Sequence, residues 1–199
     1  MLELEFGLLG PLTVTSGHRP LPVSAAKQRV ILALLLLRGN HIVSTDELID
    51  AIWNESPPAT ARVTLQNYVR RLRRTFGSSG NGRIRTVDPG YQIDINPNDL
   101  DVNRFDRLCR QAQDHMRTGE WESASPRLRE ALDLWRGDPL VDVPCRSLTL
   151  EVVPRLNEAH LQATESWLEA ELHQAKHTEV ITQLRQLAQT EPRSRSCTS

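Results

Sequence analysis

Long hydrophobic runs are missing from this 199-residue sequence, and their absence excludes a membrane-spanning helix. The longest apolar run, residues 30–37, is far shorter than the roughly 18 residues that a span requires. Glu3 and Glu5 stand where a secretory signal would carry positive charge, so we expect no signal peptide and no membrane partner. Only three cysteines are present, without the close pairing of a disulfide framework or a zinc cluster, which favours a reducing, cytoplasmic location.

Motifs of common catalytic and nucleotide-binding sites are also absent. The sequence has no G-x-x-x-x-G-K-[ST] loop, no H-E-x-x-H pair and no recognisable nucleophile–base arrangement. Glu169, His173 and His177 recur every four residues, a spacing that could align metal ligands, but surface helices carry such residues more often. We therefore expect no enzyme activity, no cofactor and no metal.

Positive charge is present but concentrated in one part of the chain. The formal net charge is −1 for the whole chain, yet residues 1–97 carry 11 basic and 8 acidic residues, and residues 98–199 carry 13 and 17. The segment 56–87 holds seven arginines and no acidic residue. This asymmetry predicts a nucleic-acid partner for the first part of the chain.

The pattern of residues 1–97 predicts strands, three helices and a terminal hairpin. Short alternating pieces over 2–23 indicate strands, and a nearly all-apolar helix follows from 25 to 38, with Ser24 as its cap. Ser44 and Glu47 have capping-box spacing for a second helix ending at Trp53, and a third helix runs from 60 to 76. Residues 83–95 alternate around Asp88-Pro89-Gly90 and predict a hairpin. This order predicts an α+β winged helix with a small antiparallel sheet and a C-terminal hairpin wing.

Helical periodicity alone dominates residues 98–199, after a predicted linker at 96–99. Apolar stripes predict an antiparallel pair of helices up to Trp135, a long helix from 148 to 173 and a further helix from 178 to 190. We expect an all-α, tetratricopeptide-like domain. Its face near Ile181, Leu184 and Leu187 is expected to be covered by another subunit or partner, or else to pack back on the preceding helix.

The third helix has two faces of opposite chemistry. A rotation of about 100° per residue groups Leu65 with three other apolar residues on one side and places arginines and Asn67 on the other. Arginine can bond guanine or phosphate, and asparagine can pair with adenine. The alternatives are a solvated helix face and, for Arg83 and Arg85, a solvated strand face. The expected DNA contacts are Arg62, Thr64, Asn67, Arg70, Arg71, Arg73, Arg74, Arg83, Arg85, Tyr91 and Gln92.

Several spaced motifs together resemble one known family. They are FGLLGPL at 6–12, LIDAIW at 48–53, VTLQNYVRRLRR at 63–74, TVDPGY at 86–91 and WRGDPL at 135–140. The chain resembles the Streptomyces antibiotic regulatory proteins, in which an OmpR-type winged helix, the output fold of phosphorelay regulators, precedes a bacterial transcriptional activation domain. Two features differ: Gln92 stands where the family often has a basic wing residue, and the polar tail 192–199 makes the activation domain look shortened.

The resemblance implies a sequence-specific transcription activator of a secondary-metabolite cluster, for instance one that makes an antibiotic. Such activators bind direct repeats in promoter DNA, self-associate there and contact RNA polymerase holoenzyme. We expect the winged helix at 1–97 and the activation domain at 98–199. Two alternatives stay open: a helical protein-interaction module with an accessory winged helix, and an activation-deficient competitor of full-length relatives.

Overall fold

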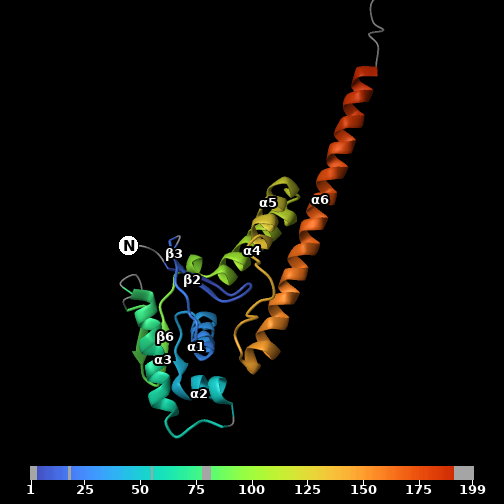
Figure 1. The fold of residues 1–199 in the computed structure, drawn as a ribbon. Coiled ribbons are helices and arrows are strands. Elements are labelled where there is room, and N and C mark those ends of the chain that lie inside the picture. The colour runs from blue at the N-terminus through green and yellow to red at the C-terminus, as the bar shows by residue number, and fades with distance from the viewer. Residues whose placement is uncertain (1–3, 18, 55, 78–81, 191–199) are drawn as a thin grey trace, which may run out of the picture.

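The computed structural model describes residues 4–17, 19–54, 56–77 and 82–190, and for 176–190 it describes the backbone alone. Two small sheets and three helices form the N-terminal half, and three helices form the C-terminal half (Figure 1). The predicted succession of an α+β winged helix and an all-α domain is confirmed. No helix in these ranges is both long enough and apolar enough to cross a membrane.

The first sheet is an antiparallel meander of β1 (Leu4–Gly7), β2 (Thr13–Ser16) and β3 (Arg19–Pro20). Phe6 pairs with Val14. Residues directly opposite each other in an antiparallel pair point to the same face of the sheet, and both of these side chains are buried. This sheet lies between the two halves of the chain in Figure 1.

Three helices follow: α1 (Ala26–Leu37), α2 (Thr45–Trp53) and α3 (Ala61–Phe76). All seven residues from Val30 to Leu36 in α1 are buried, as its apolar composition predicts for a central helix. The Ser44 hydroxyl accepts a hydrogen bond from Glu47 N at 3.1 Å, which confirms the predicted start of α2. The predicted Ser24 cap is wrong, because Ala25 occupies the cap position and no side chain bonds there.

The second sheet forms the wing, in the order β4 (Val43–Ser44), β6 (Gly90–Ile93) and β5 (Ile84–Val87). The predicted hairpin is β5–β6, and the short strand β4 was not predicted. A Cβ atom at Gly90 would lie 1.9 Å from the Val43 carbonyl oxygen, so only glycine allows β4 to approach β6 this closely.

Residues 96–99 form an ordered turn instead of the predicted linker. A 3-10 helix, η2 (Pro97–Asp99), begins after Asn96, and the side chains of Asn96 and Asp99 make a reciprocal capping box. Asp99 is buried. The connection between the halves is therefore an ordered turn, because the Asp99 carboxylate is hydrogen-bonded internally.

The C-terminal half consists of α4 (Asp101–Arg117), α5 (Trp121–Leu132), the short π-helix η3 (Leu148–Val152) and α6 (Val153–Thr190). The predicted break near 174–177 is wrong, because α6 is continuous and no glycine or proline interrupts it there. Ile181, Leu184 and Leu187 fall outside the described side chains. The α6 helix runs well past the α4–α5 pair in Figure 1.

The two hydrophobic cores do not follow the predicted division at 97/98. The core of the winged helix also contains Leu100 and four residues of the segment before α6, namely Leu140, Val143, Cys145 and Leu148. Conversely, Leu9 of the β1–β2 turn packs in the core of the C-terminal half. The segment 140–148 therefore belongs physically to the winged helix.

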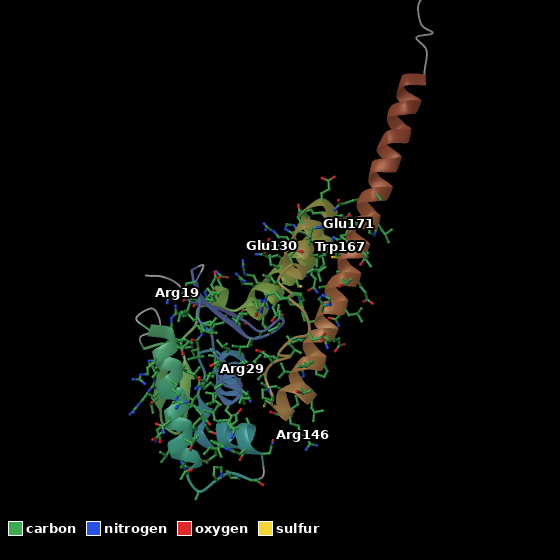
Figure 2. The ribbon with its side chains drawn as sticks, in the orientation of Figure 1. Arg19, Arg29, Glu130, Arg146, Trp167 and Glu171 are labelled. Atoms are coloured by element: carbon green, nitrogen blue, oxygen red, sulfur yellow. The ribbon has the colours of Figure 1, made fainter. Side chains whose placement is uncertain are left out.

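Polar contacts reinforce this joint between the halves. The buried Asp101 carboxylate accepts hydrogen bonds from the backbone N–H groups of Leu8 and Leu9 at 2.8–3.0 Å, and from the Arg136 guanidinium at 3.0 Å. Arg29 in α1, labelled in Figure 2, donates to the Asp142 carbonyl at 2.7 Å. Contacts of this kind fix the direction of one half relative to the other.

Candidate nucleic-acid interface

One face of α3 is anchored in the core of the winged helix. Ala61, Leu65, Val69, Leu72 and Phe76 are all buried on this helix. Phe76 also meets Phe6 edge to face, with the ring centroids 5.9 Å apart. The predicted rotation of the helix is confirmed. The buried face fixes the orientation of α3, and the residues on the opposite side of the helix therefore point outward.

The outward face carries a cluster of positive charge. Arg70, Arg71 and Arg74 are exposed, and their guanidinium groups make no hydrogen bond or ion pair within the part of the chain that the structure describes. Asn67 is exposed among them, and Thr64 is half-buried at the edge. Because these arginines lack internal partners, their donors are available to an external anion.

Val63 and Gln66 also belong to this face, although the sequence analysis did not include them among the expected contacts. Val63 is 59% exposed, and Gln66 is exposed beside it. The signal was present: the same 100° rotation places Val63 about 160° from Leu65. An exposed valine between arginines offers an apolar contact of the kind that a thymine methyl accepts.

Two arginines at the flanks of α3 have partners inside the protein. Arg62 pairs with Asp46 of α2 at 2.7 Å, with both side chains largely exposed. Arg73 donates from Nε to the Ile84 carbonyl and from Nη2 to the Thr86 hydroxyl, both at 2.9 Å. Arg73 therefore ties the helix to β5 and sets the position of the wing relative to α3.

The wing differs from the prediction in the state of its arginines. Arg83 lies just before β5, and its guanidinium bonds the buried Asp99 carboxylate at 2.7 Å. Arg85 pairs with Asp94 at 2.8 Å while staying more than half exposed. Arg83 thus links the wing to η2 through its bond to Asp99, and of these two arginines only Arg85 has its side chain mainly in solvent.

Tyr91 and Gln92 were both expected at the interface, but the side chains of both make contacts inside the protein. The Tyr91 side chain is only 6% exposed and packs in the core. Burial raises the pKa of its phenol above the ordinary value, an effect that the Arg73 charge partly opposes. Gln92 donates to the Asn40 carbonyl at 2.8 Å. The expectation that Tyr91 reaches DNA is therefore corrected, because its ring is an internal packing group.

Of the three residues considered as metal ligands, the structure describes the side chains of Glu169 and His173. His173 lies against Trp121 in a parallel stack, with the ring centroids 4.0 Å apart. The His177 side chain lies outside the described residues. No cluster of three or more His, Cys, Asp or Glu side chains suited to a metal occurs among the residues that were searched.

Two family models match the chain, one over each half. The model described as "Transcriptional regulatory protein, C terminal" matches residues 22–93, which include α1 to β6. The model described as "Bacterial transcriptional activator domain" matches residues 100–197.

Regulatory proteins are among the curated relatives of this chain. The regulatory protein DnrI of Streptomyces peucetius is 35% identical over 197 residues, covering 95% of this chain and 72% of that protein. The transcriptional regulatory protein EmbR of Mycobacterium tuberculosis strain H37Rv is 35% identical over 193 residues, and the chain spans half of its length. The regulatory protein AfsR of Streptomyces coelicolor is 34% identical, with 19% of its length covered.

A solved structure has the same fold. It is that of Mycobacterium tuberculosis EmbR in complex with a low affinity phosphopeptide, which matches with a TM-score of 0.84 and 34% identity over 96% of this chain and 52% of the other. The agreement extends over both halves of the chain. The chain therefore belongs to the Streptomyces antibiotic regulatory protein family of transcription regulators.

Proposed function

We propose that this chain activates transcription by placing α3 in the major groove of promoter DNA. The observation that carries the proposal is the set of three arginines, Arg70, Arg71 and Arg74, that are exposed without internal partners on a helix anchored from behind. A major groove about 12 Å wide accepts one α-helix. The basic, acid-free face supplies the attraction for phosphate that DNA binding requires.

The position of each residue suggests its role in this complex. Val63, Asn67 and Arg74 lie along the centre of the outward face and would meet base edges, whereas Arg70 and Arg71 flank that line. Arg85 and the exposed edge of the wing would approach the neighbouring backbone. Arg73 and Arg83 act indirectly, by holding the wing.

The finer parts of the function rest on the family. We propose that the binding sites are direct repeats in promoters of a secondary-metabolite cluster such as an antibiotic cluster, that subunits associate on these repeats, and that the bound chains contact RNA polymerase holoenzyme. The name of EmbR supports regulation of transcription, and the activator-domain match supports activation.

A binding measurement tests the proposal at α3. Duplexes are selected from a random pool by the purified chain, and their affinity is followed by fluorescence anisotropy over a range of salt concentrations. Arg74→Ala should weaken binding of the selected duplex by about 1 to 3 kcal/mol and relax the sequence preference at one base pair. Arg71→Ala should have the same effect if Arg71 contacts a guanine. If Arg71 contacts a phosphate instead, the substitution should weaken binding of all duplexes alike and reduce the slope of log affinity against log salt concentration by about 1.

Arg107→Ala is the matched control for these substitutions. Arg107 is an exposed arginine of α4 that lies far from α3 along the chain. Its replacement removes the same charge and should leave binding unchanged. Equal losses in Arg74→Ala and Arg107→Ala would show that the attraction is a general charge effect, and α3 would lose its assigned role.

The direct-repeat part has its own test. Winged helices that occupy one face of DNA need repeats about one helical turn, or ~10 to 11 base pairs, apart. Inserting half a turn between two selected sites should abolish joint occupancy in a footprinting titration. Undiminished joint occupancy would show that the subunits bind independently.

A further inference from the structure

Two arginines beside the outward face of α3 are each paired with a carboxylate that solvent can reach. Arg62, in the first turn of α3, bonds Asp46 of α2 at 2.7 Å, and their side chains are 68% and 75% exposed. Arg85 of β5 bonds Asp94, which directly follows β6, at 2.8 Å, and their side chains are 54% and 40% exposed. Both pairs therefore lie at the surface, where an external anion can approach the arginine.

Each of these contacts uses a single guanidinium nitrogen. In both pairs Nη2 donates to one carboxylate oxygen, and neither Arg62 nor Arg85 makes another hydrogen bond within the described part of the chain. A guanidinium carries five N–H donors, so most donors of both arginines stay open to solvent. Arg73 and Arg83 differ, because each bonds a backbone carbonyl as well as a side chain. Arg62 and Arg85 can therefore change partner without a change in the fold.

The weakness of exposed ion pairs decides what the two carboxylates do to DNA binding. Such pairs contribute little, because water and salt screen both charges, so the benefit of orienting an arginine in advance is small. The opposing effect is larger. Each carboxylate cancels a charge that would otherwise release a counterion on contact with phosphate, and it also repels the phosphate itself. The net effect of Asp46 and Asp94 is therefore to weaken the attachment to DNA.

Other acidic residues near these pairs hold no arginine of this surface. Glu47 pairs with Arg38 at the end of α1. Asp50, one turn after Asp46 in α2, and Asp88, at the tip of the wing, are exposed and form no ion pair within the described residues. Restraint of an arginine beside α3 by a solvent-accessible carboxylate is thus specific to Asp46 and Asp94 in that part of the chain.

We propose that Asp46 and Asp94 limit the affinity of this chain for DNA by occupying Arg62 and Arg85, whose guanidinium groups transfer to phosphate when the chain binds. The two carboxylates act through these arginines, and they set the strength of a contact that is the same for every DNA sequence. The inference rests on the proposed function of α3, because it requires a bound duplex.

Asp46→Asn and Asp94→Asn test the proposal, because asparagine keeps the size of the side chain and removes its charge. Affinities for the selected duplex and for a random duplex are measured by fluorescence anisotropy over a range of salt concentrations. Each variant should bind both duplexes about threefold or more tightly than the parent, and the slope of log affinity against log salt concentration should steepen by about 1. The ratio of the two affinities should equal that of the parent.

Double variants show whether the gain depends on the arginines. Arg62→Gln combined with Asp46→Asn should return both the affinity and the slope to those of the parent, because no released charge is left to contact phosphate. Arg85→Gln combined with Asp94→Asn should do the same on the wing. If the carboxylates acted by repulsion alone, the gain would persist in the double variants.

Asp50→Asn is the matched control on α2. It removes the same charge one turn after Asp46 but releases no arginine, so affinity and slope should stay close to those of the parent. Melting temperatures of all variants are measured alongside. A variant with a damaged fold would bind DNA more weakly, so damage cannot produce the expected gain.

Three outcomes would overturn the proposal. Unchanged affinity in both single variants would show that the carboxylates restrain nothing, and a loss of affinity would show that they orient the arginines for DNA. A gain that persists in the double variants, or that Asp50→Asn reproduces, would be general repulsion. In each case the loss of affinity in Arg74→Ala would remain, whereas a failure of the proposed function would remove that loss.

Discussion

At the residue scale, Arg73 and Arg74 are neighbours in the sequence but differ in what their guanidinium groups contact. Arg73 bonds two groups of β5, whereas Arg74 has no partner in the described part of the chain. The same contrast separates Arg83, which is bonded to a buried carboxylate, from the largely exposed Arg85. An arginine-rich segment thus divides into residues that hold the fold and residues that are free for a ligand.

The Arg83–Asp99 pair gives a direct test of this division. Asp99→Ala leaves the Arg83 charge without its partner and removes the capping bond to Asn96 N. We expect the free energy of unfolding to fall by roughly 2 to 4 kcal/mol, somewhat less than for a fully buried pair, because a fifth of the Arg83 side chain is exposed. Chemical denaturation measures the loss. A variant as stable as the parent would show that the pair contributes little.

Cys109 provides a second test, through its proton. Burial, followed by the charge of Asp106, raises the pKa of the Cys109 thiol to about 11 from 9.0, so its thiolate fraction at pH 8 is roughly a hundredfold smaller than that of an ordinary cysteine. Alkylation by iodoacetamide, followed by peptide mass spectrometry, should be correspondingly slow and should accelerate as the pH rises towards 11. The urea-unfolded chain is the control and should react at the ordinary rate. Equally fast alkylation of the folded chain would contradict the raised pKa.

The sequence predicted which α3 residues face outward, because helical periodicity is a local property. It did not predict what Arg83 contacts, since Asp99 lies in a turn whose ordered shape depends on a capping box that was taken for a linker. Tyr91 was misplaced for a similar reason. Alternation along a strand gives two faces, and only the tertiary packing shows which face is covered.

At the scale of elements, α3 works because its two faces are chemically separate. Leu72 and Val63 are both branched apolar residues of this helix, yet Leu72 is fully buried and Val63 is 59% exposed. The difference follows from their angular positions and from no property of the side chains themselves.

Paired substitutions on α3 therefore have opposite effects. Leu72→Ala should lower the free energy of unfolding by about 2 to 5 kcal/mol, because it opens a cavity behind the helix. Val63→Ala should change it by less than about 0.5 kcal/mol while altering DNA affinity. Thermal denaturation and anisotropy on the same two proteins provide the measurements. Equal melting temperatures for the two variants would refute the rotation of α3.

The helix α6 shows where element prediction from sequence ends. Helical structure was predicted to resume near 148, and it does so with η3, which leads into α6 at Val153. The length of α6 was not predicted, since two helices, 148–173 and 178–190, were expected although no helix-breaking residue lies between them. Polarity alone does not end a helix that solvent can surround.

At the scale of the whole molecule, the winged helix is completed by residues that follow α5. Leu140, Val143, Cys145 and Leu148 are buried in its core, and Asp142 bonds both Leu12 N and the Arg29 side chain. No local pattern could have revealed this, because the contacts join residues more than a hundred positions apart. The domain boundary predicted at 97/98 remains a prediction, and the two hydrophobic cores each contain residues from both sides of it.

Fragments of the chain test how far the winged helix depends on this segment. Each buried leucine or valine contributes about 1.5 to 3 kcal/mol, so losing the segment removes much of the roughly 5 to 15 kcal/mol that stabilises a domain. Residues 1–97 alone should therefore melt well below the full chain in circular dichroism, and residues 1–153, which retain the segment, should melt closer to it. Matching melting curves for 1–97 and the full chain would show that 97/98 is a true boundary.

The joint built on Asp101 has a geometric consequence for the proposed complex. Because Asp101 and Arg136 fix the β1–β2 turn to the C-terminal half, α6 keeps one direction relative to α3. When α3 lies in a groove, α6 then points to one side of the DNA axis, at an azimuth that the binding site itself determines. Each base pair added between that site and the promoter turns this direction by about 34°, so the helical phase of the site decides which side of the duplex α6 reaches.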